Sequence, residues 1–125
     1  MLGKAYDRCV QVYTPEEWQN AADALASQPA TQGVSRRLSR LHFSSGYPSQ
    51  LDRSGRVLVP PQLREYAGLG ESVVLVGTGR FIEIWDRSAW EQESELLDAQ
   101  ASEIAEAAAA LASPPGAVNG GDGGR

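Results

Sequence analysis

Apolar and polar residues alternate in two segments of the chain, at residues 9–13 and 81–85. Each segment has apolar side chains at alternate positions and ends in an aromatic residue, a pattern typical of a β-strand with one buried face. A capping residue follows each strand, Thr14 in one case and Asp86 in the other. A helix with a tryptophan in its first turn is predicted after each cap. The pattern therefore predicts the same strand–helix unit twice.

The two units form an internal repeat with a constant offset. Residues 9–18 align without a gap with residues 81–90, at an offset of 72 residues. The second copy extends back to about Gly46, so the matching part of the first copy would lie before Met1. We therefore expect the first copy to be present only in its C-terminal half. Either the chain is shortened at its N-terminus or its start is placed too late.

The segments between and within the copies predict further elements from their apolar spacing and from their glycine and proline residues. In chain order, these are a helix at 18–28, a helix at 34–43, a hairpin with strands 47–51 and 57–59, a helix at 62–67 and a hairpin with strands 73–76 and 81–85. Proline begins the 62–67 helix and Gly68 ends it. The second copy is thus predicted to be β-β-α-β-β followed by a helix.

The last predicted helix runs from Arg87 to about Ala112. Its apolar residues lie seven apart, which gives a narrow stripe for packing against another element. They are Trp90, Leu97, Ile104 and Leu111. The stripe packs either on the chain's own domain or between subunits. Residues 113–125 are rich in glycine and proline and are predicted to be disordered.

The composition is that of a folded protein of 125 residues with 42% apolar residues and one cysteine, Cys9, which is expected to be buried. Its net charge of −5 argues against a generic nucleic-acid binder. The charge is unevenly distributed, however. Residues 33–66 hold six arginines and two acids, whereas residues 83–106 hold eight acids and one arginine. The middle of the chain can therefore face phosphate groups while the C-terminal helix faces away.

Catalytic and metal-binding patterns have little support. His42 is the only histidine and has no cysteine or carboxylate at ligand spacing, so we expect a capping or surface role. Residues 77–79, Gly-Thr-Gly, are better explained as a hairpin turn than as a phosphate loop. The acids of the last helix are expected to form a solvated face. The sequence predicts no enzyme, no metal site and no cofactor.

The most informative motif is Asp52-Arg53-Ser54-Gly55-Arg56. We expect a bulged hairpin turn in which Gly55 adopts a positive φ and Asp52 caps backbone amides. These structural roles do not explain the arginines on either side of Gly55. A guanidinium group fits phosphate oxygens or a guanine edge, and a twisted hairpin can enter the major groove. The motif favours nucleic-acid contact by Arg53 and Arg56, although hairpin arginines also form ordinary salt bridges.

The string from Asp52 to Pro60 resembles the signature of the SpoVT-AbrB superfamily of swapped-hairpin DNA-binding domains. The residues that follow, 63–69, 73–77 and 83–85 with Trp90, resemble the MraZ family more closely. That family carries two tandem modules, as the internal repeat does. The resemblance implies an α+β fold, a swapped-hairpin β-barrel with flanking helices and an incomplete first module. Its divisions would be a first-module remnant at 1–19, a helical connector at 20–45, the second module at 46–89, the C-terminal helix at 90–112 and the tail at 113–125.

The resemblance also implies a function. Members are sequence-specific transcriptional regulators of the division and cell-wall gene cluster, and they bind promoter direct repeats in double-stranded DNA. A ring-shaped homo-oligomer in the cytoplasm and nucleoid is expected, with no membrane and no small-molecule substrate. Arg53 and Arg56 would contact DNA, Asp52 and Gly55 would shape their loop, and Arg64 is a further DNA-binding candidate. Three more arginines are possible backbone contacts: Arg36, Arg37 and Arg40.

Two alternatives remain open on the sequence. The first is an antitoxin-like module that binds DNA and neutralises a toxin through its tail. The second is a structural or interaction subunit that does not bind DNA.

Overall fold

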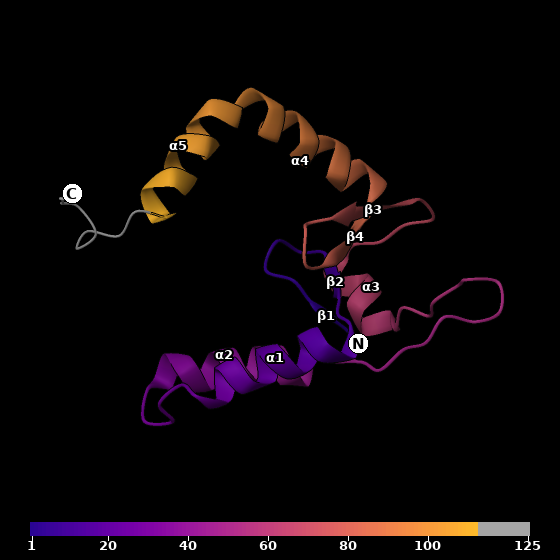
Figure 1. The fold of residues 1–125 in the computed structure, drawn as a ribbon. Helices are drawn as coiled ribbons and strands as arrows, with labels where there is room; N and C mark the ends of the chain where they lie inside the picture. The colour runs from indigo at the N-terminus through magenta and orange to yellow at the C-terminus, as the bar shows by residue number, and fades with distance from the viewer. Residues whose placement is uncertain (113–125) are drawn as a thin grey trace. The chain divides into compact units, whose positions relative to one another are not determined.

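The computed structural model describes residues 1–112, so the predicted disordered tail at 113–125 lies outside the described residues. The chain divides into two units, Met1–Trp90 and Glu91–Arg125. The first unit contains the sheet and three complete helices (Figure 1). The second unit contains most of the C-terminal helical region.

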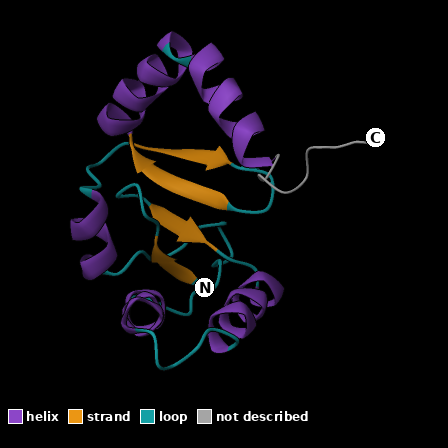
Figure 2. Cartoon of the chain, turned by 90° about the vertical axis from the view of Figure 1, so that its left-hand side faces the viewer, coloured by secondary structure: helices purple, strands orange, loops and turns teal. Residues whose placement is uncertain are grey.

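The sheet of the first unit has four antiparallel strands in the order β1-β2-β4-β3 (Figure 2). The strands are β1 (Leu2–Lys4), β2 (Val10–Val12), β3 (Val73–Gly77) and β4 (Ile82–Asp86). The two strand segments that share the repeat pattern, β2 and β4, pair directly with each other. The α+β class and the hairpin formed by β3 and β4 are confirmed. The pattern missed β1, because three residues are too few to show a period of two.

The predicted strands at 47–51 and 57–59 form no ladder, and in this respect the prediction is wrong. Tyr47 makes an isolated bridge to Leu2, and the segment's own closing bond joins Asp52 N to Arg56 O at 2.8 Å. Within residues 1–112 the sheet is therefore open and not a closed barrel. A two-stranded hairpin is only marginally stable without an apolar surface to pack on. Leu51 and Leu58 of this hairpin are exposed.

The helices of the first unit are α1 (Pro15–Ala26), α2 (Gly33–Ser44) and α3 (Pro61–Ala67), and α4 starts at Arg87. Of these, α1 and α4 begin directly after the predicted capping residues, Thr14 and Asp86. Thr14 caps α1 by accepting a bond from Glu17 N at 3.0 Å. The Glu17 carboxylate accepts from Arg80 Nε at 3.0 Å, which ties the β3–β4 turn to α1.

The buried residue of α2 is a serine. Ser35 is buried, whereas the apolar residues Val34 and Leu41 are exposed. Ser35 Oγ donates to Gln28 Oε1 at 3.3 Å, next to the end of α1. A small side chain lets α1 and α2 approach closely, and the hydroxyl group finds a partner there.

The expected single C-terminal helix is two helices, α4 (Arg87–Ala99) and α5 (Ala101–Ala112). The helical pattern is interrupted at Gln100. Backbone bonds still cross this position, because Gln100 N donates to Leu96 O and Ile104 N donates to Gln100 O. Leu97, Ile104 and Leu111 of the predicted stripe are all exposed.

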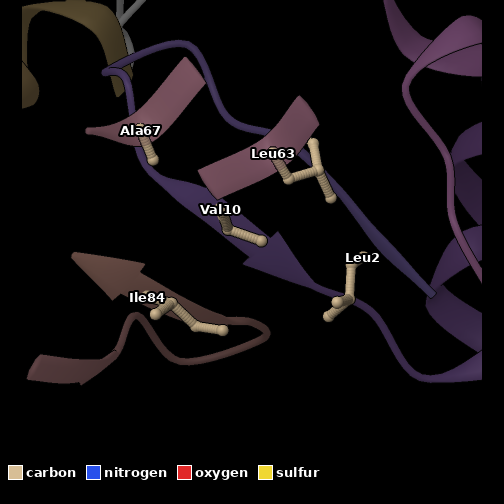
Figure 3. Close-up of a cluster of buried hydrophobic side chains, with 5 residues drawn as sticks. All are labelled: Leu2, Val10, Leu63, Ala67 and Ile84. Atoms are coloured by element: carbon tan, nitrogen blue, oxygen red, sulfur yellow. The ribbon is translucent and has the colours of Figure 1, made fainter. Parts of the chain in front are cut away.

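The main core lies between α3 and the sheet. Leu63 and Ala67 of α3 point toward Leu2, Val10 and Ile84 of the strands (Figure 3). A second cluster holds Ala5, Cys9 and Trp85, with Trp90 packed against it. Burial raises the pKa of the Cys9 thiol to about 12, and the nearby Glu83 carboxylate adds to the effect. Cys9 is therefore a buried, protonated thiol, as predicted.

An aromatic cluster lies at the other side of the sheet, and His42 belongs to it. The imidazole stacks on Trp18 with ring centroids 4.4 Å apart and an interplanar angle of 20°. Tyr13, Phe43 and Phe81 complete the cluster. The expectation of a capping or surface role for His42 is wrong, because the ring is held among aromatic rings. Burial lowers its pKa, and among residues 1–112 its buried Nε2 atom has no hydrogen-bond partner.

Candidate nucleic-acid interface

The arginine-bearing turn is built by Asp52. Its Oδ1 atom accepts bonds from Ser54 N and Arg56 N, each at 2.8 Å, and Gly55 N donates to Asp52 O at 3.0 Å. Gly55 has φ of +79°, in the left-handed region that glycine adopts at little cost. The geometry is a three-residue hairpin turn with a glycine bulge. The carboxylate and the glycine together fix the shape of the loop.

The same bonds keep Asp52 charged. Its pKa is lowered, first by the backbone amide of Arg56 and further by the amide of Ser54 and the Arg56 side chain, although desolvation opposes the shift. A hydrogen-bonded carboxylate at the base of the turn also reduces the local positive charge. With two arginines and one aspartate, residues 52–56 carry one net positive charge.

Arg53 and Arg56 both lie on the outside of the turn. The Arg56 side chain is 79% exposed and donates from Nε to Asp52 Oδ2 at 3.1 Å. This bond uses the Nε donor of the guanidinium group. Arg53 is exposed and makes no ion pair within the described part of the chain. Arg56 thus forms an exposed salt bridge with Asp52, as hairpin arginines often do, and its guanidinium group remains accessible to solvent.

Arg64 lies on the helix that follows the turn. The neighbouring Leu63 and the later Ala67 are buried, so α3 is anchored by one face and Arg64 projects from another. Gly68 ends α3 with φ of +62°. The hairpin loop extends from unit 1 next to α3 (Figure 1). Arg64 thus follows the turn in the chain, and no side-chain hydrogen bond joins it to Arg53 or Arg56.

The arginines of α2 form a separate basic surface. Arg36 donates from Nη1 to Ala30 O at 2.8 Å, which closes the loop before the helix. Arg37 and Arg40 are exposed. One of the three residues is therefore partly used in local structure, and the other two are open to solvent.

The structure also brings together two cations that sequence reasoning missed. Lys4 and Arg8 both lie over the ring of Tyr66, 5.0 and 4.9 Å from its centroid. The Tyr66 hydroxyl donates to Ala5 O at 2.6 Å, which fixes the ring. Lys4, Arg8 and Tyr66 line a groove of about 570 Å³ that also includes Gln62. The only sequence signal was the position of Arg8 beside a strand turn, where the structure gives it φ of +61°.

Other kinds of site find no support in the described residues. Across residues 1–112, no three residues among histidine, cysteine, aspartate and glutamate are grouped closely enough to hold a metal ion. In the same range, every helix is too short or too polar to cross a membrane.

The fold and the site define an α+β protein that displays two arginines on a rigid hairpin turn beside an open antiparallel sheet. Comparison with known families agrees with the resemblance seen in the sequence. The family model described as "MraZ protein, putative antitoxin-like" matches residues 43–112. The chain belongs to the MraZ family.

Curated relatives match over a larger part of the chain. A protein of Coxiella burnetii (strain RSA 493 / Nine Mile phase I) is 45% identical over 89 residues, which are 71% of this chain and 59% of that protein. A protein of Halorhodospira halophila is 44% identical over 110 residues, 88% of this chain and 68% of its own length. One from Acetivibrio thermocellus is 39% identical over 111 residues, covering 89% and 78%. All three carry the name "Transcriptional regulator MraZ". The chain thus spans about 59% of the length of the Coxiella relative.

Proposed function

We propose that this protein is a DNA-binding transcriptional regulator whose hairpin arginines contact the duplex. The observation that carries the proposal is the geometry of the turn: Asp52 fixes the loop by two backbone bonds, and Arg53 and Arg56 lie exposed on its outside. Membership of the MraZ family and the names of the relatives support the same function. Arginine on a fixed loop is well suited to phosphate oxygens and to the O6 and N7 atoms of guanine.

The proposed mechanism is multivalent. A single turn supplies few contacts, so one hairpin binds weakly. A homo-oligomer, arranged as a ring, would place several turns on successive direct repeats, and each further contact is then made at high effective concentration. Phosphate contacts position the protein and base contacts give specificity. In this proposal Arg64 contributes to positioning, as do Arg37 and Arg40.

The finer parts of the proposal follow from the resemblance to the family. We expect repression of the division and cell-wall gene cluster through direct repeats in its promoter. The protein would then act in the cytoplasm, at the nucleoid. Catalysis is not part of this function.

The decisive experiment is a fluorescence-anisotropy titration with promoter DNA that contains the direct repeats. Arg56→Ala should weaken binding by about 1–3 kcal/mol if the residue contacts a base, and Arg53→Ala should act in the same direction. Arg87→Ala is the matched control, because it removes the same charge from an exposed position away from the turn. Circular dichroism checks that each variant is folded. Wild-type affinity in both turn variants would remove the hairpin from the interface.

The salt dependence separates the roles of the arginines. Binding should weaken steeply between about 50 and 200 mM salt, because each phosphate contact releases counterions. Loss of one phosphate contact should reduce the slope of log K against log salt by about one. A variant that lowers affinity without changing this slope has lost a base contact instead.

An antitoxin-like DNA-binding module is the second candidate, and the description of the matching family model favours it. Such a protein would neutralise a toxin as well as bind DNA. Affinity purification from the native host, followed by mass spectrometry, tests this. Recovery of a stoichiometric toxin would support it. A chain that neither shifts promoter DNA nor retains a toxin would be a structural or interaction subunit.

A further inference from the structure

The β1–β2 turn, the end of α2 and one side of α3 surround the groove that contains Lys4 and Arg8. Its volume of about 570 Å³ lies within the range of small-ligand sites. The side chains that line it are mostly polar or charged. They include Lys4, Arg8, Ser45, Gln62, Glu65 and Tyr66. In Figure 1 the β1–β2 turn lies on one side of α3 and the arginine-bearing hairpin on the other, so the groove is separate from the arginine turn.

Two cationic groups share the ring of Tyr66 in this groove. Lys4 Nζ lies 5.0 Å and Arg8 Cζ lies 4.9 Å from the ring centroid, so the two groups are within about 10 Å of each other. Neither forms an ion pair within residues 1–112, although Glu65 also lines the groove. Charges this close are not fully screened, because the screening length is about 8 Å at physiological salt. The two positive charges can therefore act together on one anion.

Hydrogen bonds hold the groove in shape. The Tyr66 hydroxyl donates to Ala5 O at 2.6 Å, and Ala5 N donates to Cys9 O at 2.9 Å, which closes the turn between β1 and β2. Lys4 N donates to Ser45 Oγ at 3.3 Å, which ties the same strand to the end of α2. The ring and the backbone around it are thus fixed before a ligand arrives. A preorganised site loses less conformational entropy when a ligand binds.

The backbone conformation of Arg8 is unfavourable. Arg8 has φ of +61° and is the one non-glycine residue with a positive φ among residues 1–112. The β3–β4 turn uses a glycine for its positive φ, Gly79 at +95°. A side chain in the left-handed region costs free energy that glycine avoids, and Arg8 forms no ion pair in the described residues that would offset this cost. Backbone strain of this kind is concentrated at functional sites.

The groove does not depend on the first residue of the chain, since Met1 does not line it. The internal repeat also leaves it open. β2 pairs with β4, and the offset of 72 residues relates one strand to the other. Residues 47–67 of the second copy cover the β1–β2 half of the sheet. By the same relation, the equivalent residues of a complete first copy would cover the β3–β4 half and not the β1–β2 turn.

We propose that this groove is a binding site for a phosphate group, held by Lys4 and Arg8 beside the ring of Tyr66. Each cation forms charge-assisted hydrogen bonds with phosphate oxygens. These oxygens are arranged tetrahedrally, so two cations that approach from different directions can each bond one, whereas the oxygens of a carboxylate lie in one plane. The Gln62 amide lines the groove as a further donor. The phosphate group belongs either to the DNA backbone or to a free phosphate compound.

The test is a titration of the 125-residue protein with inorganic pyrophosphate, followed by the amide chemical shifts in nuclear magnetic resonance spectra. The amides of Lys4, Arg8 and Gln62 should shift and reach saturation. Lys4→Gln should weaken binding about tenfold, the loss expected for one charge-assisted hydrogen bond. Arg87→Gln is the matched control, because it removes a positive charge from an exposed position on α4. It should bind pyrophosphate as the wild type does.

Two further variants separate binding from folding. Arg8→Gly should weaken pyrophosphate binding by a similar factor without lowering the melting temperature, because glycine adopts the φ of this position at little cost. Glu65→Gln should have the opposite effect and tighten binding, because it removes the negative charge that lines the groove. A loss of binding at an unchanged melting temperature does not come from unfolding.

DNA titrations at several salt concentrations identify the source of the phosphate group. If it belongs to DNA, Lys4→Gln should reduce the slope of log K against log salt by about one, and pyrophosphate should compete with DNA. If it belongs to a free compound, Lys4→Gln should lose pyrophosphate binding and keep the wild-type affinity and slope for DNA. Both results support a phosphate site in the groove.

Three results of the pyrophosphate titration would overturn the proposal. They are the absence of shifts at the groove amides, shifts confined to the arginine turn at residues 52–56, and an unchanged affinity in both Lys4→Gln and Arg8→Gly. This titration requires no DNA, so its outcome is separate from the DNA-binding test of Arg56.

Discussion

The two halves of the sheet have nearly the same local sequence pattern but opposite surroundings. In the β1–β2 half, α3 and the segment at Tyr47 cover both the apolar face and the edge. In the β3–β4 half, Leu75 and Ile82 remain exposed. The repeat therefore specifies two equivalent surfaces, and the chain between the copies covers only one of them.

The aromatic pairs of the two copies show the same contrast. Tyr13 and Trp18 lie 5.1 Å apart and belong to a cluster that includes His42 of α2. Their counterparts Trp85 and Trp90 lie 5.5 Å apart and pack on small residues such as Ala5 and Cys9. The segment that connects the two copies packs against the first copy. The first copy therefore gains both the main core, through α3, and the titratable ring of His42.

The largest expected effect compares Leu2 of β1 with Leu75 of β3, which pair with the equivalent repeat positions Val12 and Ile84. Leu2→Ala should destabilise the protein by about 2–5 kcal/mol, because a buried side chain is removed and a cavity remains. Leu75→Ala should change the stability by no more than about 0.5 kcal/mol, as expected for a surface substitution. Urea unfolding of both variants measures the difference. Equal losses would show that the two halves are covered alike.

A second comparison uses the glycines before and within the arginine turn. A Cβ atom at Gly46 would lie 2.5 Å from a ring carbon of Trp18, so Gly46→Ala should cost about 1–3 kcal/mol by overpacking the first aromatic cluster. A Cβ at Gly55 would meet no heavy atom within 4 Å, but φ is +79° there. Gly55→Ala should cost about 1–2 kcal/mol of backbone strain.

The two glycine variants differ in their readout as well. Gly46→Ala should change the near-ultraviolet circular dichroism of Trp18, whereas Gly55→Ala should leave that signal unchanged and alter the turn. Unchanged near-ultraviolet signal in folded Gly46→Ala would contradict the close approach of Gly46 to Trp18.

The caps that begin the two repeat helices give a smaller comparison. Thr14→Ala should destabilise the first unit by about 1 kcal/mol, because the bond to Glu17 N is lost. Asp86→Ala should cost more than Thr14→Ala, since Asp86 accepts from Gly70 N at 2.9 Å as well as from Ala89 N at 3.4 Å. Thermal unfolding of the two variants measures which of them loses more stability. A smaller loss in Asp86→Ala would show that its second bond is not stabilising.

The smallest expected effect concerns pH. Burial lowers the pKa of His42 in the folded protein, so the unfolded chain takes up the proton first as pH falls. The stability contributed by the neutral ring is complete above the ordinary histidine pKa of about 6.5 and is lost progressively as pH falls below it. Urea unfolding between about pH 5 and 7, where Asp and Glu remain largely charged, measures this loss. His42→Phe should remove this dependence of the free energy of unfolding on pH. A dependence that persists in the variant would come from another titratable group.

Much of the fold could be predicted from local signals. Caps and breakers placed α1, α3 and the β3–β4 hairpin, because Thr14, the prolines at 60–61 and Gly68 act on their immediate neighbours. The turn chemistry of Asp52 and Gly55 is local for the same reason. Long-range partners were less accessible. The bond between Glu17 and Arg80 and the stacking of His42 on Trp18 join residues from different elements.

The sequence by itself determined the repeat, the caps of α1 and α3 and the shape of the arginine turn, because caps and turns depend on interactions within a few residues. Only the tertiary structure decided which of two equivalent surfaces would be covered. Leu2 and Leu75 have the same side chain and equivalent strand partners, so no local pattern distinguishes them. Their difference arises because α3 and Tyr47 can pack at one place only, and that choice leaves β3 with an open edge.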